Sequence, residues 1–129
     1  MVRRRALVEA SVIELVDDAP DGVFGLRAAG VVTPDEYATM VRPALERWLT
    51  TAEHLHVLAI LEDDFAYADG DWNSATDGVL KLSQWRRLGV VTDAGWLRRL
   101  TPMASFFVPG KVRTFPHHKL HDARAWVSL

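Results

Sequence analysis

Five short hydrophobic segments have the character of β-strands, because they are rich in branched apolar residues and are bounded by turn formers. The first two are separated by Asp17–Gly22, a stretch of turn-forming residues that predicts a hairpin. The third is an almost continuous apolar run, typical of a central strand that is covered on both faces. In chain order the segments are Val12–Val16, Val23–Ala28, Leu55–Leu61, Leu88–Thr92 and Val112–Phe115.

Elsewhere, apolar residues recur at the spacing of amphipathic helices. The first helix has a marked beginning, because Thr33 can cap it, Pro34 suits its first position and Glu36 completes a capping box. The second is predicted to end near Trp85–Arg87, and Asp93 stands where it can cap the third. The inward residues are Val41, Ala44, Leu45 and Trp48 in the first helix, Trp72, Ala75, Val79 and Leu82 in the second, Trp96, Leu100, Ala104 and Phe107 in the third, and Leu120, Ala123 and Val127 in the last.

These elements follow one another in the order ββαβαβαβα. A hairpin followed by alternating strands and helices predicts a mixed β-sheet whose later strands are parallel, with helices flanking the sheet. The fold class is therefore α/β. The chain contains no repeat, low-complexity tract or linker, so we expect a single domain over residues 11–129 behind an N-terminal extension, residues 1–10.

Composition excludes classes of protein without supplying a chemistry. The chain has 129 residues, 49% of them hydrophobic and 25% charged, as in ordinary globular domains. Its net charge of −2 gives no sign of nucleic-acid binding, and the absence of cysteine excludes disulfides and thiolate chemistry. The basic start at Arg3–Arg5 is followed by an apolar stretch that Glu9 interrupts, and no apolar run reaches the length of a membrane span. We expect a cytoplasmic protein with no integral membrane segment.

Acidic residues gather after the central strand, at Glu62, Asp63, Asp64, Asp69, Asp71 and Asp77. Asp69, Asp71 and Asn73 match the first, third and fifth positions of a calcium-binding loop. However, Ser74 stands where that loop needs glycine, and Leu80 stands where it needs glutamate. We therefore expect a solvated loop, with Asp71 near a helix N-terminus where negative charge is favourable, and a hydrolase built on this loop is disfavoured.

Histidines offer a second candidate metal site. His117, His118 and His121 lie at the start of the last helix, and two of them can share one helix face and bind zinc. No third protein ligand is assignable from the sequence, so we expect exposed side chains and no metal ion. His54 and His56, at the start of the central strand, are expected to be structural.

Motifs of nucleophilic or cofactor-dependent catalysis are missing from the sequence. The serines lack the flanking glycines of a G-x-S-x-G elbow, and no phosphate-cradling or dinucleotide-binding glycine motif is present. We therefore predict that the protein is not an enzyme, has no catalytic residues and needs no cofactor.

Several strings of the sequence, in order, resemble the motifs of one family. They are Ala29–Tyr37 (AGVVTPDEY), Glu62–Phe65 (EDDF), Arg87–Trp96 (RLGVVTDAGW), Val112–Phe115 (VRTF) and Ala123–Val127 (ARAWV). The chain thus resembles the SpoIIAA-like proteins, small bacterial domains of the STAS type whose layout is also compared with the CRAL-TRIO lipid carriers. The resemblance extends from Val12 to Val127. It implies a mixed sheet flanked by helices, no catalytic residues, and binding of small hydrophobic or lipid-like molecules or of protein partners.

The resemblance does not include the phosphorylation switch of the wider STAS group. Anti-sigma-factor antagonists carry a phosphorylatable serine in a D-S-S-G-type turn at the start of the helix after the central strand. This chain has Asp69–Ser74 (DGDWNS) at that place, so the motif is absent. We do not expect Ser74 to act as a phosphorylation switch.

Aromatic residues on the second and third predicted helices form the candidate binding surface. Phe106, Phe107 and Val108 are consecutive at a helix end, so they cannot all face one core. A ligand pocket, a dimer contact or local folding back can cover them, and the resemblance favours the first two. We predict that a small apolar or amphipathic ligand binds between sheet and helices, lined by Trp72, Trp96, Phe106 and Phe107, with Arg98 or Arg99 for an anionic head group. The alternative is a protein-interaction or homodimeric module that uses the same helical face.

Overall fold

The protein is described by a computed structural model over residues 12–16, 18–71, 74, 84–95 and 111–129. These residues form a five-stranded sheet in the order β1-β2-β4-β6-β7 and a two-stranded sheet, β3-β5. The strands are β1 (Val12–Leu15), β2 (Phe24–Ala29), β3 (Val31–Val32), β4 (Leu55–Leu61), β5 (Ala66–Tyr67), β6 (Trp85–Val91) and β7 (Lys111–Phe115).

The large sheet is mixed, as predicted. β1 pairs antiparallel with β2, which confirms the hairpin, whereas β2, β4, β6 and β7 are parallel neighbours. The hairpin requires a glycine at position 25, because a side chain there would begin 2.9 Å from the Cβ atom of Ala19. Each strand of the β3-β5 pair has two residues, too few for a hydrophobic pattern to predict.

The first helical segment runs without a break through α1 (Pro34–Glu36), η1 (Tyr37–Val41) and α2 (Arg42–Trp48). Its predicted capping box is confirmed: the Glu36 amide donates to the Thr33 hydroxyl at 3.1 Å, and the Thr33 amide donates to the Glu36 carboxylate at 3.0 Å. The segment widens into a π-helix at η1, which the sequence pattern did not predict. The physical reason is Pro43, which has no amide to donate to the carbonyl four residues earlier.

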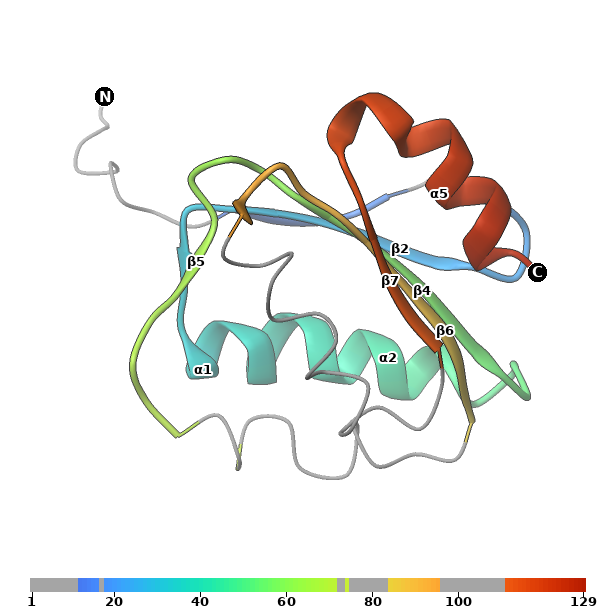
Figure 1. Cartoon of the computed structure of the whole chain (residues 1–129). Coiled ribbons are helices and arrows are strands. Elements are labelled where there is room, and N and C mark those ends of the chain that lie inside the picture. The colour runs from blue at the N-terminus through green and yellow to red at the C-terminus, as the bar shows by residue number, and fades with distance from the viewer. Residues whose placement is uncertain (1–11, 17, 72–73, 75–83, 96–110) are drawn as a thin grey trace.

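Helices cover both faces of the sheet, with α2 on one face and α5 (Leu120–Val127), preceded by η2 (His117–Lys119), on the other (Figure 1). Alternate residues of β4 enter the two cores, as expected for a central strand. The α2 side buries Phe24, Val41, Ala44, Leu45, Leu55, Val57 and Trp85 together. The α5 side buries Val23, Leu58, Ile60, Val91, Phe115, Ala123 and Val127.

Two local predictions were wrong. Trp85–Arg87 was expected to end a helix, but these residues begin β6, because Trp85 pairs with Leu55 and its ring is buried in the α2-side core. Asp93 was expected to cap a helix, but its carboxylate forms hydrogen bonds with His117 instead.

Other predictions fall outside the described residues. They are the N-terminal extension and the greater parts of the second and third predicted helices, at residues 72–82 and 96–107. Among the helices that the structure does describe, none has the length and hydropathy needed to cross a membrane.

The capping box should contribute measurably to stability. Replacing Thr33 with alanine leaves the Glu36 amide without its side-chain acceptor, so we expect T33A to lower the free energy of unfolding by about 1 kcal/mol in urea denaturation. T39A is the control, because the Thr39 hydroxyl donates to the Asp35 carbonyl within the same helical segment. We expect T39A to change stability by less than about 0.5 kcal/mol, and equal losses would contradict the role of the cap.

Candidate functional site

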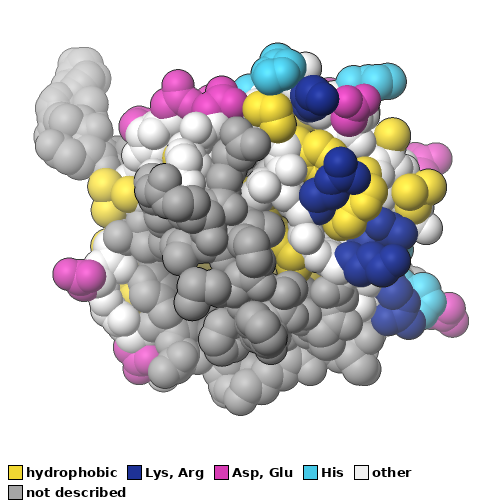
Figure 2. Space-filling view, viewed as in Figure 1, with side chains coloured by type: hydrophobic (Ala, Val, Ile, Leu, Met, Phe, Trp, Pro, Cys, Tyr) yellow, Lys and Arg dark blue, Asp and Glu magenta, His cyan; other side chains and the backbone are white. Residues whose placement is uncertain are grey.

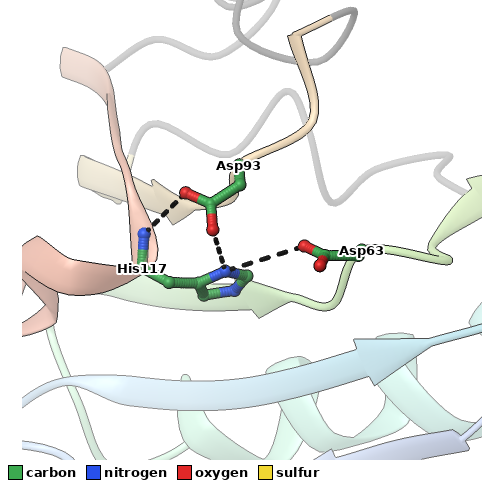
Figure 3. Close-up of side chains that lie close together, drawn as sticks. All are labelled: Asp63, Asp93 and His117. Carbon is green, nitrogen blue, oxygen red and sulfur yellow. Dashed lines mark hydrogen bonds and ion pairs between the residues drawn. The ribbon is translucent and has the colours of Figure 1, made fainter.

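Three polar residues follow three neighbouring strands of the large sheet. Asp63 comes after β4, Asp93 after β6 and His117 after β7. Because these strands are parallel, their carboxyl ends lie at one edge, which is where open α/β sheets bind ligands. Figure 3 shows the carboxylates of Asp63 and Asp93 pointing toward the ring of His117. We call them the carboxyl-edge cluster.

Both carboxylate oxygens of Asp93 contact His117. One carboxylate oxygen accepts a hydrogen bond from the His117 backbone amide at 3.1 Å, and the other lies 2.9 Å from Nδ1 of the ring. Oδ1 of Asp63 lies 4.0 Å from the same Nδ1 atom. Because Nδ1 faces two carboxylates, it carries the ring proton. The other ring nitrogen, Nε2, is buried and has no hydrogen-bond partner among the described residues.

The electrostatics of the cluster centre on Asp93. The pKa of its carboxyl is lowered, chiefly by the hydrogen bond from the His117 amide and then by the hydrogen bond from the His117 ring. The charges of His117 and His118 act in the same direction, while burial opposes them. The side chain of Asp63 is 85% exposed and that of His117 is 28% exposed. The cluster therefore lies at the protein surface and does not line a deep pocket.

Two carboxylates and an imidazole are a donor set that divalent cations accept. One ligand atom from each residue lies within 4.8 Å of the other two. However, Nδ1 already donates its proton to Asp93, so a cation would have to displace that proton. Nε2 is enclosed and therefore cannot reach a substrate as a base. In the arrangement described, the cluster is an electrostatic clamp that joins the end of β6 to the start of η2.

The comparisons with known proteins agree with this architecture. A family model described as SpoIIAA-like matches residues 23–128. The chain belongs to the SpoIIAA-like family.

Among solved structures, this chain is similar to an uncharacterized protein of the DUF3478 family, with a SpoIIAA-like fold, from Shewanella loihica PV-4. The TM-score is 0.66 with 19% sequence identity, and the match covers 98% of each chain. At this identity the likeness concerns the fold alone. No curated protein matches the chain. The family match and the fold confirm the resemblance and the α/β class read from the sequence.

The carboxyl-edge cluster corrects one prediction about this SpoIIAA-like domain. His117 was expected to be exposed at the strand-to-helix turn, but it is half-buried and bound by Asp93, whereas His118 is exposed as predicted. In the sequence, His117 stands among other histidines and Asp63 stands in the acidic loop, so no local pattern joins the two residues. The available signal was a titratable residue two positions after the end of each of three strands.

Two further predictions are confirmed. His56 is structural, because its Nδ1 atom lies 2.7 Å from the Val127 carbonyl oxygen and so ties β4 to α5. Asp71 accepts a hydrogen bond from the Ser74 amide at 3.0 Å, as expected of an acidic residue near a helix N-terminus. Ser74 itself is exposed, and its carbonyl accepts a hydrogen bond from Arg42 at 3.0 Å.

The residues predicted to line a ligand lie outside the described part of the SpoIIAA-like domain. They are Trp72, Trp96, Arg98, Arg99, Phe106 and Phe107. Their role stays a prediction.

The Asp93 clamp should make stability depend on pH. Because the pKa of Asp93 in the folded protein is below 3.8, its carboxylate stabilises the folded state at neutral pH. That stabilisation is lost as the pH falls through the folded pKa. We expect D93N to be less stable than the wild type at neutral pH, and the difference between them to shrink below about pH 3.8, measured by urea denaturation across this range.

D63N is the matched control. Asp63 is exposed and lies farther from the ring, so its replacement should change stability little at either pH. A loss for D63N as large as that for D93N, or a D93N deficit that persists in acid, would contradict the clamp.

Proposed function

We propose that this SpoIIAA-like domain is a non-enzymatic cytoplasmic protein that binds a small apolar or amphipathic molecule on the α2 side of its sheet. The observation that carries the proposal is a strip of half-buried apolar side chains on β6 and β7. The strip consists of Leu88, Val90 and Val112, and we call it the apolar strip.

The two sides of β6 differ in how well they are covered. β6 lies inside the sheet, between β4 and β7, and interior parallel strands normally bury both faces. On the α5 side, Val91 and the facing Val127 are both 0% exposed. On the α2 side, the apolar strip borders the core but remains in contact with solvent. An apolar ligand would remove this surface from water.

Chain connectivity supports the predicted lining residues. The connections β5–β6 and β6–β7 contain Trp72 in the first and Trp96, Phe106 and Phe107 in the second. α2 itself lies in the β2–β4 connection, on the side of the sheet that carries the apolar strip. Arg99, in the second connection, offers a cation for an anionic head group.

The alternative function is protein interaction, as a homodimer or as a regulatory module of the anti-sigma-factor-antagonist kind without the serine motif. The edge strand β1 favours it, because Val12 and Leu15 are 46% and 52% exposed there. An edge strand with exposed apolar side chains can pair with a second chain.

Native mass spectrometry distinguishes the two functions. The protein is purified without detergent, weighed intact, and then extracted with organic solvent. A monomer carrying a discrete adduct of a few hundred daltons supports ligand binding, and the extract identifies the ligand class. A bare species of twice the chain mass supports the interaction module, and a bare monomer counts against both.

Neighbouring valines on β6 provide a sharper test of the apolar strip. Val90 lies on the α2 side and Val91 on the sealed α5 side. If a ligand occupies the space beside the strip, V90F should fill that space, keep stability within about 1 kcal/mol of the wild type and abolish the adduct. V91F should overpack the α5 side and cost about 1–3 kcal/mol. An adduct retained by V90F, or equal destabilisation by both variants, would count against the pocket.

A further inference from the structure

A basic cavity lies at the opposite end of the sheet from the carboxyl-edge cluster. Its volume is about 320 Å³, and its lining is His54, His56, Arg86, Arg87, Lys111 and Leu129. These residues come from the starts of β4, β6 and β7 and from the chain beyond α5. Three side chains of this lining carry a positive charge, those of Arg86, Arg87 and Lys111. This positive cavity belongs to a chain whose net charge is −2.

Strand register aligns the basic residues. His56 of β4 pairs with Arg87 of β6, and Arg87 pairs with Lys111 of β7. Cross-strand partners project from the same face of a sheet, so these side chains form a row. The row lies on the α5 side, because Nδ1 of His56 bonds the Val127 carbonyl and the Arg87 guanidinium lies 4.7 Å from the centre of the Trp126 ring.

A β-bulge adds another cation to the row. Leu55 pairs with Trp85 but His56 pairs with Arg87, so Arg86 is an extra residue in β6. Trp85 and Leu88 both pack in the α2-side core, which leaves Arg86 and Arg87 between them. Simple alternation would send these two arginines to opposite faces, whereas both line the same cavity. Bulges are frequent beside binding sites, where they redirect a side chain.

Such a row of like charges is unfavourable unless an anion compensates it. Within the described residues, arginine forms ion pairs with carboxylates at Arg27–Glu62 and at Arg124–Asp18. Neither Arg87 nor Lys111 forms an ion pair with a carboxylate of these residues. Figure 2 shows Lys and Arg side chains gathered with apolar groups over β7 and α5. Because Arg87 stacks on the face of Trp126, the N–H groups in the guanidinium plane stay available to bind two oxygens of one anion.

We propose that this cavity binds the phosphate group of a phosphomonoester. A phosphate dianion matches several converging cations better than a single carboxylate does, and the volume suits a small ligand or one head group. The phosphate belongs either to a free small molecule or to a phospholipid head group. This site is separate from the apolar strip, since it lies on the α5 side of the sheet, so the proposal does not depend on the proposed function.

The test is an NMR titration of the full chain with glycerol 3-phosphate, at millimolar concentrations and constant ionic strength. We expect saturable shifts of the backbone amides of Arg86, Arg87 and Lys111, and no such shifts with sodium chloride. K111Q removes one charged donor from the cavity and should weaken binding about tenfold.

R113Q is the matched control. Arg113 is also an exposed cation of β7, two residues further along, but it does not line the cavity and its guanidinium lies over the Phe115 ring. We expect R113Q to change the affinity less than about twofold, as a change in general charge alone would.

Vesicles of phosphatidylcholine with and without phosphatidic acid distinguish the two sources of phosphate. If the protein sediments with phosphatidic acid vesicles, K111Q does not, and glycerol 3-phosphate shows no saturable binding, the ligand is a lipid head group. Saturable binding of the soluble phosphate would support a free ligand. The proposal would be overturned if neither probe binds, or if K111Q and R113Q lose affinity equally.

Discussion

The parallel pairing of β4 with β2 on one side and β6 on the other is the constraint on which the rest of the structure depends. It buries a seven-residue apolar strand on both faces and therefore requires a helix layer on each. It also aligns the strand ends, so residues distant in sequence meet at two edges. One edge carries Asp63, Asp93 and His117, and the other carries the basic cavity.

The two faces of the sheet have different characters. On the α5 face, Gly89 lies under Val127, and side chains from both layers exclude water from the contact. On the α2 face, the core beneath α2 is closed, but the apolar strip on β6 and β7 stays half-buried. The α5 face is therefore closed by packing, whereas the α2 face keeps apolar side chains in contact with solvent.

Local sequence signals predicted the elements whose stability is local. The Thr33–Glu36 capping box needs four consecutive residues, and the structure has both of its hydrogen bonds. The Leu55–Leu61 run predicted a buried central strand because its composition requires burial on both sides. The same reasoning failed at Trp85–Arg87, where helical spacing was overridden by pairing with β4 and by a bulge. It also missed the His117–Asp93 clamp, whose two residues are 24 positions apart.

By itself, the sequence determined the fold class, the family, the first hairpin and the capped start of the first helix, because hydrophobic periodicity and caps act over a few residues. Only the tertiary structure decided which strand ends share an edge, which cations share a cavity and which face of β6 is completely buried. Those outcomes depend on strand register, and a shift of register by one residue reverses every side chain. Register is set by packing across the whole sheet, so no short stretch of the chain encodes it.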